Sequence, residues 1–280
     1  MRQALILLAA SAPLLITGCS PGPTAAQPIG DMPIGDLRIV DLTHAFGADT
    51  VYWPTDTRGF QLEQLASGRT EGGWFYSANA FCTAEHGGTH IDAPVHFAED
   101  GVPVDEVPLS DLIGPGVVID VSGEAEDNPD YRLTPEAVEA HESRHGRIPD
   151  GAIVLLRTGW SERWPDVRAY LGDDTPGDAS KLSFPSFGQN AAQLLVEERG
   201  ARALGVDTAS IDYGRSTDFE VHRIAAAQQV SGLENLTNLE ALPGAGFTII
   251  ALPMKIAGGS GGPVRVIAVL DEDADGSDRG

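Results

Sequence analysis

The sequence predicts a mixed α/β domain in which strands outnumber helices. Short apolar runs, typical of buried strands, alternate along the chain with longer segments that carry helix-capping residues at their ends. Because the two kinds of segment are interspersed, we expect one mixed sheet with helices packed on it. No internal repeat is visible in the sequence.

Seven segments predict strands because they are rich in apolar, β-branched or aromatic residues and are bounded by turn-forming residues. The first alternates apolar and polar side chains, whereas the central ones are continuously apolar and are expected to be buried. The last two are joined by a glycine-rich turn. These segments are residues 37–46, 74–85, 116–121, 152–157, 203–207, 247–252 and 264–270.

Three segments predict helices. Thr134 is a good N-cap and is followed by Pro135 at the first helical position, so a helix is expected from there to about Gly146. Residues 186–200 predict a second helix closed by glycine, and residues 219–227 predict a short third one.

The N-terminus predicts an exported protein. A short positive start and an apolar run of about a dozen residues precede Cys19, and the run is too short to span a bilayer. This pattern is typical of a bacterial lipoprotein signal with Cys19 as the lipidated residue; an ordinary secretory signal is the alternative. We therefore expect a lipid anchor in the cell envelope, facing the periplasm or the exterior. The expected parts are a signal peptide (1–18), a flexible tether (19–36), the folded domain (37–270) and an acidic tail (271–280).

Charge and cysteine content restrict the partners. The formal net charge is −23, which argues against nucleic acid and anionic membrane surfaces as partners. Contact with a membrane is then expected only through the lipid anchor. Beyond Cys19 the single cysteine is Cys82, so no disulfide within the chain is expected. Cys82 lies in a strand-like run and is expected to be a buried thiol.

Chemistry concentrates between His86 and His96. Three of the seven histidines fall within these eleven residues, and Asp92 lies between the second and the third. Imidazole and carboxylate ligands suit zinc, manganese or iron. Glycines after His86 and a proline before His96 exclude one continuous helix, so His90 and Asp92 are expected on extended backbone with their side chains on one face.

Two other motifs compete with this one. His141 and His145 match the zinc-peptidase pattern His-Glu-x-x-His, but the predicted helix stops one residue later and no third histidine follows, so a solvated helix end is the favoured interpretation. Residues 258–262 match the nucleophile pattern Gly-x-Ser-x-Gly, yet a proline and a strand follow instead of a helix. A flexible loop is expected there, with a place at the edge of a site as a further option.

A second cluster lies in the C-terminal half. His222 and Glu234 are twelve residues apart, and Glu234 stands in an otherwise apolar run where a carboxylate needs a partner. From the residues alone, two interpretations stay open: His222 and Glu234 belong to a functional site, or they form a hydrogen-bonded pair in the core.

The run from His86 to Phe97 resembles the motif of the cyclase family of metal-dependent hydrolases, which includes bacterial kynurenine formamidase and, more distantly, isatin hydrolase. Four weaker motifs follow along the chain in the same order as in the family: 156–160, 205–210, His222 and 233–236. The resemblance therefore extends over about residues 37–270. It implies a mixed-sheet, swivelling β/β/α fold and assembly into a homodimer or homotetramer.

The resemblance also implies roles for individual residues. His86, His90 and Asp92 match the ligands of one metal, and Asp92, His222 and Glu234 match those of a second, with Asp92 bridging. His96 matches the general acid/base, and Glu234 is counted with it as catalytic. Zinc is the first expectation and manganese the second, with one or two ions per chain.

The expected reaction is hydrolysis of an amide, such as the aryl formamide N-formylkynurenine, by a metal-activated water. A cyclic amide or lactone is the alternative substrate, and a non-catalytic metal-binding lipoprotein is the alternative from another class. Four aromatic residues near the motif are candidates for a wall against a flat substrate, with plain core packing as the other option: Trp53, Trp74, Phe75 and Phe97.

Overall fold

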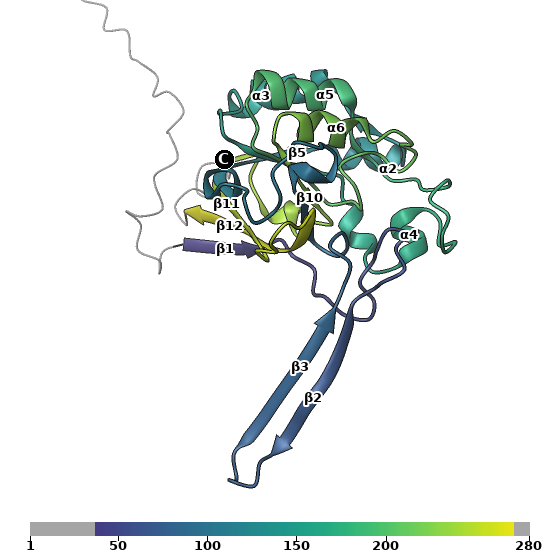
Figure 1. The fold of residues 1–280 in the computed structure, drawn as a ribbon. Helices are drawn as coiled ribbons and strands as arrows, with labels where there is room; N and C mark the ends of the chain where they lie inside the picture. Colours follow the sequence, from purple (N-terminus) through teal and green to yellow (C-terminus); the bar gives the residue numbers. More distant parts are fainter. Residues whose placement is uncertain (1–36, 272–280) are drawn as a thin grey trace, which may run out of the picture.

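A computed structural model describes residues 37–271, which are organised around a sheet of eight strands that closes into a barrel (Figure 1). The sheet closes because the short strand β4 pairs with β10 on one side and with the beginning of β12 on the other. In sheet order the strands are β1 (Leu37–Asp41), β12 (Gly261–Asp271), β11 (Ala245–Pro253), β5 (Ile113–Asp120), β7 (Ile153–Arg157), β9 (Ala203–Val206), β10 (Ser231–Glu234) and β4 (His90–Asp92).

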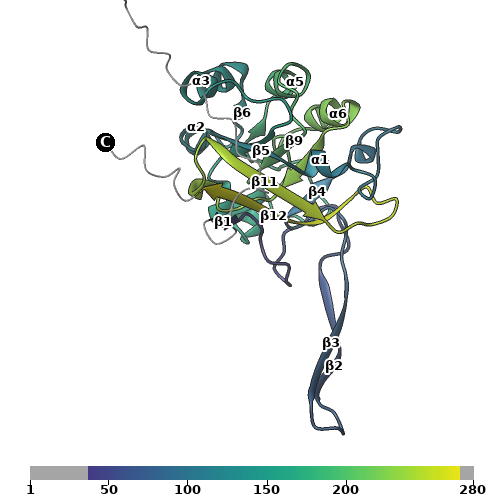
Figure 2. The same cartoon turned by 90° about the vertical axis from the view of Figure 1, so that its left-hand side faces the viewer.

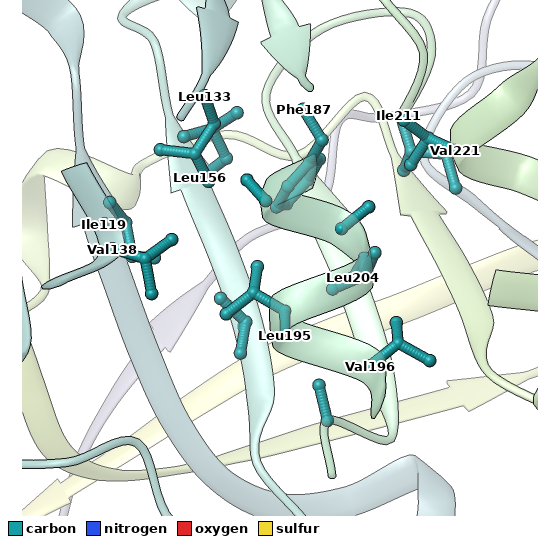
Figure 3. Packing of buried hydrophobic residues seen from close by; sticks show 14 of the residues in the cluster. Ile119, Leu133, Val138, Leu156, Phe187, Leu195, Val196, Leu204, Ile211 and Val221 are labelled. Carbon is teal, nitrogen blue, oxygen red and sulfur yellow. The ribbon is translucent and has the colours of Figure 1, made fainter. Parts of the chain in front are cut away.

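The centre of the sheet is parallel and apolar on both faces. Strands β5, β7, β9 and β10 run parallel to one another, and parallel strands need cover on both sides. Helices α3 (Pro135–His145), α5 (Gln189–Gln193) and α6 (Glu220–Ala227) lie together over one face (Figure 2). Figure 3 shows that core: Leu195 and Val196, in the helical turn that continues α5, pack toward Leu156 and Leu204 of the strands.

Alternate residues of the same strands form the core on the other face. Val118, Ile153 and Leu155 point away from the helices and pack with side chains of β10, β11 and β12. The strict alternation between the two clusters reflects the two-residue period of a strand. The two apolar cores support the closed sheet, in which β4 joins β10 to β12. The predicted metal ligands His90 and Asp92 lie on this joining strand.

A long hairpin projects from this body (Figures 1 and 2). It consists of β2 (Gln61–Arg69) and β3 (Phe75–Cys82), which among the described strands pair only with each other. The expectation that Cys82 is buried is wrong: the residue is exposed, because the two-stranded ribbon has no core to cover either face. Strand β2 was not predicted, since it lacks β-branched and aromatic residues.

The structure confirms the seven predicted strands and the three predicted helices, with shifted ends. Thr134 caps α3 by accepting a hydrogen bond from Ala137 N, and the helix ends before Gly146, whose φ is +88°. The segment predicted as a helix from residue 186 begins later, at Gln189. Short helices and strands that were not predicted are α1 (Leu109–Leu112), α2 (Ser122–Asp127), β6 (Arg132–Leu133), α4 (Val167–Leu171), β8 (Ser186–Phe187) and β10 (Ser231–Glu234). Within residues 37–271, no helix has the length and apolar character needed to cross a bilayer.

Candidate metal centre

Three of the predicted ligands lie on two neighbouring strands where the barrel closes. His90 and Asp92 are two residues apart on β4, so their side chains leave the same face of the strand. Glu234 is the last residue of β10 and is the cross-strand partner of His90. Consequently His90 Nε2 lies 3.3 Å from Asp92 Oδ1 and 3.5 Å from Glu234 Oε2.

His86 and His96 reach the same place from the loops on either side of β4. Gly88, with φ of +59°, turns the chain between His86 and the strand in a conformation that favours glycine. After the strand, Pro94 begins a single 3-10 turn that ends at His96. The two imidazoles stack with ring centroids 3.8 Å apart, and His86 Nδ1 lies 2.6 Å from Asp92 Oδ1.

Helix α6 brings His222 to the cluster from far along the chain. His222 Nε2 lies 3.1 Å from both Asp92 Oδ2 and Glu234 Oε1. On the other side of the ring, Nδ1 lies 2.7 Å from Asp212 Oδ2, and the same oxygen accepts the backbone N–H of His222. Asp212 therefore aims Nε2 at the cluster. Sequence analysis missed Asp212, whose only signal is a carboxylate directly after an apolar and small-residue run.

Burial and mutual charge control the protonation of the cluster. His90, Asp92, His222 and Glu234 are each at most 6% exposed. Burial alone disfavours the charged form of each group, but for His90 the attraction of Asp92 and Glu234 outweighs burial and raises the pKa to about 9. Burial is likewise overcome at His222, where hydrogen bonds to Asp212 and Asp92 raise the pKa well above its usual value. Burial and the neighbouring charge of Asp92 raise the pKa of Glu234.

The donor set fits a divalent metal. Among residues 37–271, no lysine or arginine forms an ion pair with Asp92 or Glu234; their ion-pair partners there are imidazoles only. Two buried carboxylates in this arrangement call for a cation, and nitrogen with oxygen ligands suits zinc or manganese.

The donor atoms fall into two groups, each with its atoms within 4.8 Å of one another: His86, Asp92 and His96, and His90, Asp92 and Glu234. Asp92 belongs to both groups. The other members are divided differently from what the family resemblance implies, because His96 stacks on His86 and Glu234 is paired with His90 across the strands. The assignment of ligands to one ion or two stays a prediction.

The cluster forms one end of a pocket of about 250 Å³. Trp53 and Phe97 line the pocket, together with Phe219, which sequence analysis missed. The ring centroids of Phe97 and Phe219 are 5.4 Å apart, and those of Trp53 and Phe219 are 6.2 Å apart. Phe219 has φ of +51°, an uncommon conformation for a bulky residue that costs about 1 kcal/mol or more, and it directly precedes α6. The three rings form an aromatic wall beside the candidate ligands.

The structure does not bring Trp74 and Phe75 to this wall. Trp74 is 64% exposed and Phe75 is 66% exposed, and both lie at the hairpin end where β3 begins. Neither residue lines the pocket of its own chain within the part that the structure describes. Trp74 and Phe75 were predicted at the site because they are close to His86 in sequence. The long hairpin of β2 and β3 instead places them far from the pocket.

The two competing motifs lie elsewhere or serve another purpose. His141 and His145 line a separate pocket with Arg144, Arg157 and Glu240, where the described residues form no compact group of metal donors. The expected solvated helix end is wrong for His141, which is 2% exposed. The glycine-rich segment joins β11 to β12 and does border the site, because Ser260 Oγ lies 2.8 Å from His86 Nε2.

With this geometry established, comparison with known proteins identifies the family. The model of the Cyclase family, described as "Putative cyclase", matches residues 40–213. Isatin hydrolase from Roseibium aggregatum is 32% identical over 242 residues, which are 82% of this chain and 91% of that protein. Kynurenine formamidase from Salinibacter ruber is 29% identical over 235 residues, covering 81% of this chain and 95% of that protein.

A solved structure of isatin hydrolase A from Labrenzia aggregata, bound to benzyl benzoate, superposes with a TM-score of 0.77 at 37% identity and covers 85% of this chain and 95% of that one. The chain belongs to the cyclase family. Its relatives are named hydrolases of amide carbon–nitrogen bonds, so the protein is an enzyme of that class.

Proposed function

We propose that this enzyme hydrolyses an amide of a flat aromatic molecule, with an isatin-type cyclic amide as the first substrate to test. The observation that carries the proposal is the aromatic wall of Trp53, Phe97 and Phe219 beside the ligand cluster in one pocket. Aromatic side chains favour offset or edge contacts with a flat ring. The similarity to two isatin hydrolases, at 32% and 37% identity, supports the cyclic amide.

A divalent metal held by His86, His90, Asp92, His222 and Glu234 would supply a nucleophilic water at neutral pH and polarise the substrate carbonyl. Zinc is the first candidate and manganese the second. Elemental analysis of the purified protein, combined with the rate after reconstitution with each metal, would test this order. It would also give the number of ions per chain.

His96 is the residue that we propose carries the proton. Its side chain is exposed to the pocket, and among the described residues its ring nitrogens have no hydrogen-bond partner. Stacking on His86 holds the ring beside the carboxylates. His96 can therefore accept a proton from the attacking water and return it to the leaving nitrogen. Glu234 lines the same pocket as His96, and its Oε1 accepts a hydrogen bond from the backbone N–H of Ile211 at 2.9 Å, which holds the carboxylate in place.

One observation favours N-formylkynurenine as a second candidate. The carboxylate of Asp56 lines the same pocket. An amino-acid substrate carries an ammonium group that this carboxylate would attract, whereas isatin has none. The similarity to kynurenine formamidase, at 29% identity, is consistent with this possibility.

The two candidates are separated by comparing kcat/KM for isatin, N-formylkynurenine, formanilide and an aryl lactone with the metal-loaded enzyme. We expect isatin to give the highest value. Asp56→Asn should leave turnover of isatin nearly unchanged and should weaken turnover of N-formylkynurenine alone. Metal-loaded protein that turns over none of the four would overturn the proposed substrate class.

We propose that the enzyme is a homodimer, or a homotetramer built from dimers, through the hairpin of β2 and β3. A two-stranded ribbon is at best marginally stable alone. This one exposes six large apolar side chains, each at least 53% accessible: Leu62, Leu65, Trp74, Phe75, Tyr76 and Phe81. A second copy of the chain is the occupant that would cover them, and it would make Trp74 and Phe75 available to a neighbouring chain.

Light scattering after size exclusion tests the assembly. The wild type should elute as an oligomer, and the double substitution Leu65→Ser with Phe75→Ser should shift it to the monomer. Leu109→Ser is the control, because Leu109 is 65% exposed on α1 and outside the hairpin. A wild type that stays monomeric at micromolar concentration would contradict the assignment.

Export and lipid anchoring at Cys19 are likewise proposals. Cys19 and the predicted signal peptide, tether and most of the acidic tail lie outside the described residues. The support is the apolar run that ends in small residues before Cys19. Full-length protein expressed in a bacterium should fractionate with membranes, and Cys19→Ser should release it; a soluble wild type would contradict the anchor.

A further inference from the structure

A chain of hydrogen bonds runs from the glycine-rich loop to a candidate ligand. Ser260 Oγ donates to Glu85 Oε2 over 2.6 Å, and Ser260 N donates to the same oxygen over 3.1 Å. On its other side, Ser260 Oγ lies 2.8 Å from His86 Nε2. His86 Nδ1 then faces Asp92 Oδ1 at 2.6 Å. One continuous chain of polar contacts therefore links Glu85, Ser260, His86 and Asp92 in this order.

Donor and acceptor counting sets the direction of this chain of contacts. A serine hydroxyl has a single hydrogen, and Ser260 gives it to Glu85. Its oxygen can therefore only accept from His86, so Nε2 of His86 carries a hydrogen. That leaves Nδ1, which lies beside Asp92 Oδ1, as the nitrogen that can offer its lone pair to a cation shared with Asp92.

The glycines on either side of Ser260 make these contacts possible. A Cβ added at Gly259 would lie 2.7 Å from Glu85 Oε1, and one added at Gly261 would lie 2.6 Å from His86 Cε1 and 2.4 Å from the carbonyl oxygen of Ile91. Such distances are shorter than van der Waals contact. The loop therefore fits closely around Glu85 and His86, which is a positive reason for its composition.

We infer that Ser260 and Glu85 are positioning residues for the metal centre: they hold His86 in the Nε2–H tautomer with Nδ1 directed at the metal. The inference rests on the proposed metal centre and deepens it. Among residues 37–271, Glu85 forms no ion pair with lysine or arginine, so its carboxylate is engaged with Ser260 instead. Hydrogen-bonded partners of a metal-ligating histidine fix its orientation and its tautomer in this way.

Zinc affinity is the first test. Competition with a chromophoric chelator gives the Kd of the stripped protein, and Ser260→Ala should raise that Kd about 10- to 100-fold. Ser260→Thr keeps a hydroxyl and should recover most of the affinity. Glu85→Gln should have a smaller effect than Ser260→Ala, because its amide oxygen still accepts from Ser260.

Ser183→Ala is the matched control, because it also removes a part-buried hydroxyl that donates to a carboxylate, that of Asp130 at 2.8 Å, and Ser183 does not line the pocket. This variant should keep the wild-type Kd. Equal zinc affinity in wild type and Ser260→Ala would overturn the inference while leaving the metal centre intact.

NMR of the imidazoles provides a second readout that needs neither metal nor turnover. In the wild type, His86 should show a slowly exchanging Hε2 signal, assigned by its loss in His86→Gln, and Ser260→Ala should abolish the protection. If the wild type bound no zinc, the proposed function would fail, yet this signal would still decide the positioning role. A wild type without a protected Hε2 signal at His86, or with the single ring hydrogen on Nδ1, would contradict it.

Discussion

Metal binding to the stripped enzyme should release protons, and the structure sets how many. Zinc is the perturbation, added to protein from which metal has been removed by chelation. His90 has its pKa raised to about 9, and the pKa of His222 lies well above its usual value. We therefore expect both imidazoles to be protonated in the metal-free protein at pH 7.5. Each must lose its proton to bind a metal through nitrogen.

The magnitude follows from this count. Full occupancy of the centre should release about two protons per chain, so the overall dissociation constant (the Kd of a single ion, or the product of two Kd values if two ions bind) should fall about 100-fold between pH 6.5 and pH 7.5. The sign is fixed, because a raised histidine pKa stabilises the protonated metal-free state and so opposes metal binding at low pH. Charge balance supports the count, since Asp92 and Asp212, whose pKa values are lowered, face these two rings.

Isothermal titration calorimetry in buffers of different ionisation enthalpy measures the released protons directly. His96→Ala is the control: partial burial of the ring lowers the pKa of His96 to about 4, so it carries no proton to lose and the count should stay at about two. Zinc binding with no proton release and a pH-independent Kd would refute the reasoning. It would mean that His90 and His222 are neutral in the metal-free protein or are not ligands.

Three further outcomes follow from the same structure. Phe219→Ala removes one ring of the aromatic wall and should raise KM for isatin about five- to tenfold, equivalent to about 1 kcal/mol, with a smaller change in kcat; an unchanged KM would remove Phe219 from the pocket wall. Asp212→Asn should weaken zinc binding about 10- to 100-fold, measured by chelator competition, because the amide cannot hold His222 as the carboxylate does. Burial lowers the pKa of His141 to about 4, so the stability that depends on its neutral ring is complete above pH 6.5 and is lost as pH falls through 4. Denaturant unfolding of the wild type should show the free energy of unfolding fall by about 2 kcal/mol over that range. The free energy of unfolding of His141→Gln should fall by less over the same range.

The sequence predicted the local half of the site. His86, His90, Asp92 and His96 are close along the chain, and the glycines and proline among them already excluded a helix. The strand period then placed His90 and Asp92 on one face, as the structure shows.

The remote half of the site depended on tertiary structure. Glu234 meets His90 only because β10 pairs with β4, and that pairing exists only when the barrel closes. The residue pattern alone did not decide whether His222 and Glu234 belong to the site or to the core. Only the family resemblance assigned them to the same metal centre as His90 and Asp92. Asp212 and Phe219 were not predicted, and Ser260 was noticed only within the glycine-rich segment 258–262, because all three act through contacts formed by tertiary packing.

The hairpin was missed for a related reason. Strand β2 has the sequence Gln-Leu-Glu-Gln-Leu-Ala-Ser-Gly-Arg, which has no strong strand preference. Its conformation is set by pairing with β3. This also explains why Trp74 and Phe75, although close to His86 in sequence, are absent from the pocket of their own chain.

The most direct test of the account is the rate of isatin ring opening by the chelator-stripped enzyme before and after zinc or manganese is restored, with metal content measured on the same samples. We expect turnover to be lost with the metal and to return in proportion to the metal bound, and Asp92→Ala neither to retain metal nor to recover. Stripped enzyme that opens isatin as fast as the metal-loaded enzyme would contradict the central claim that the cluster around Asp92 holds the metal on which catalysis depends.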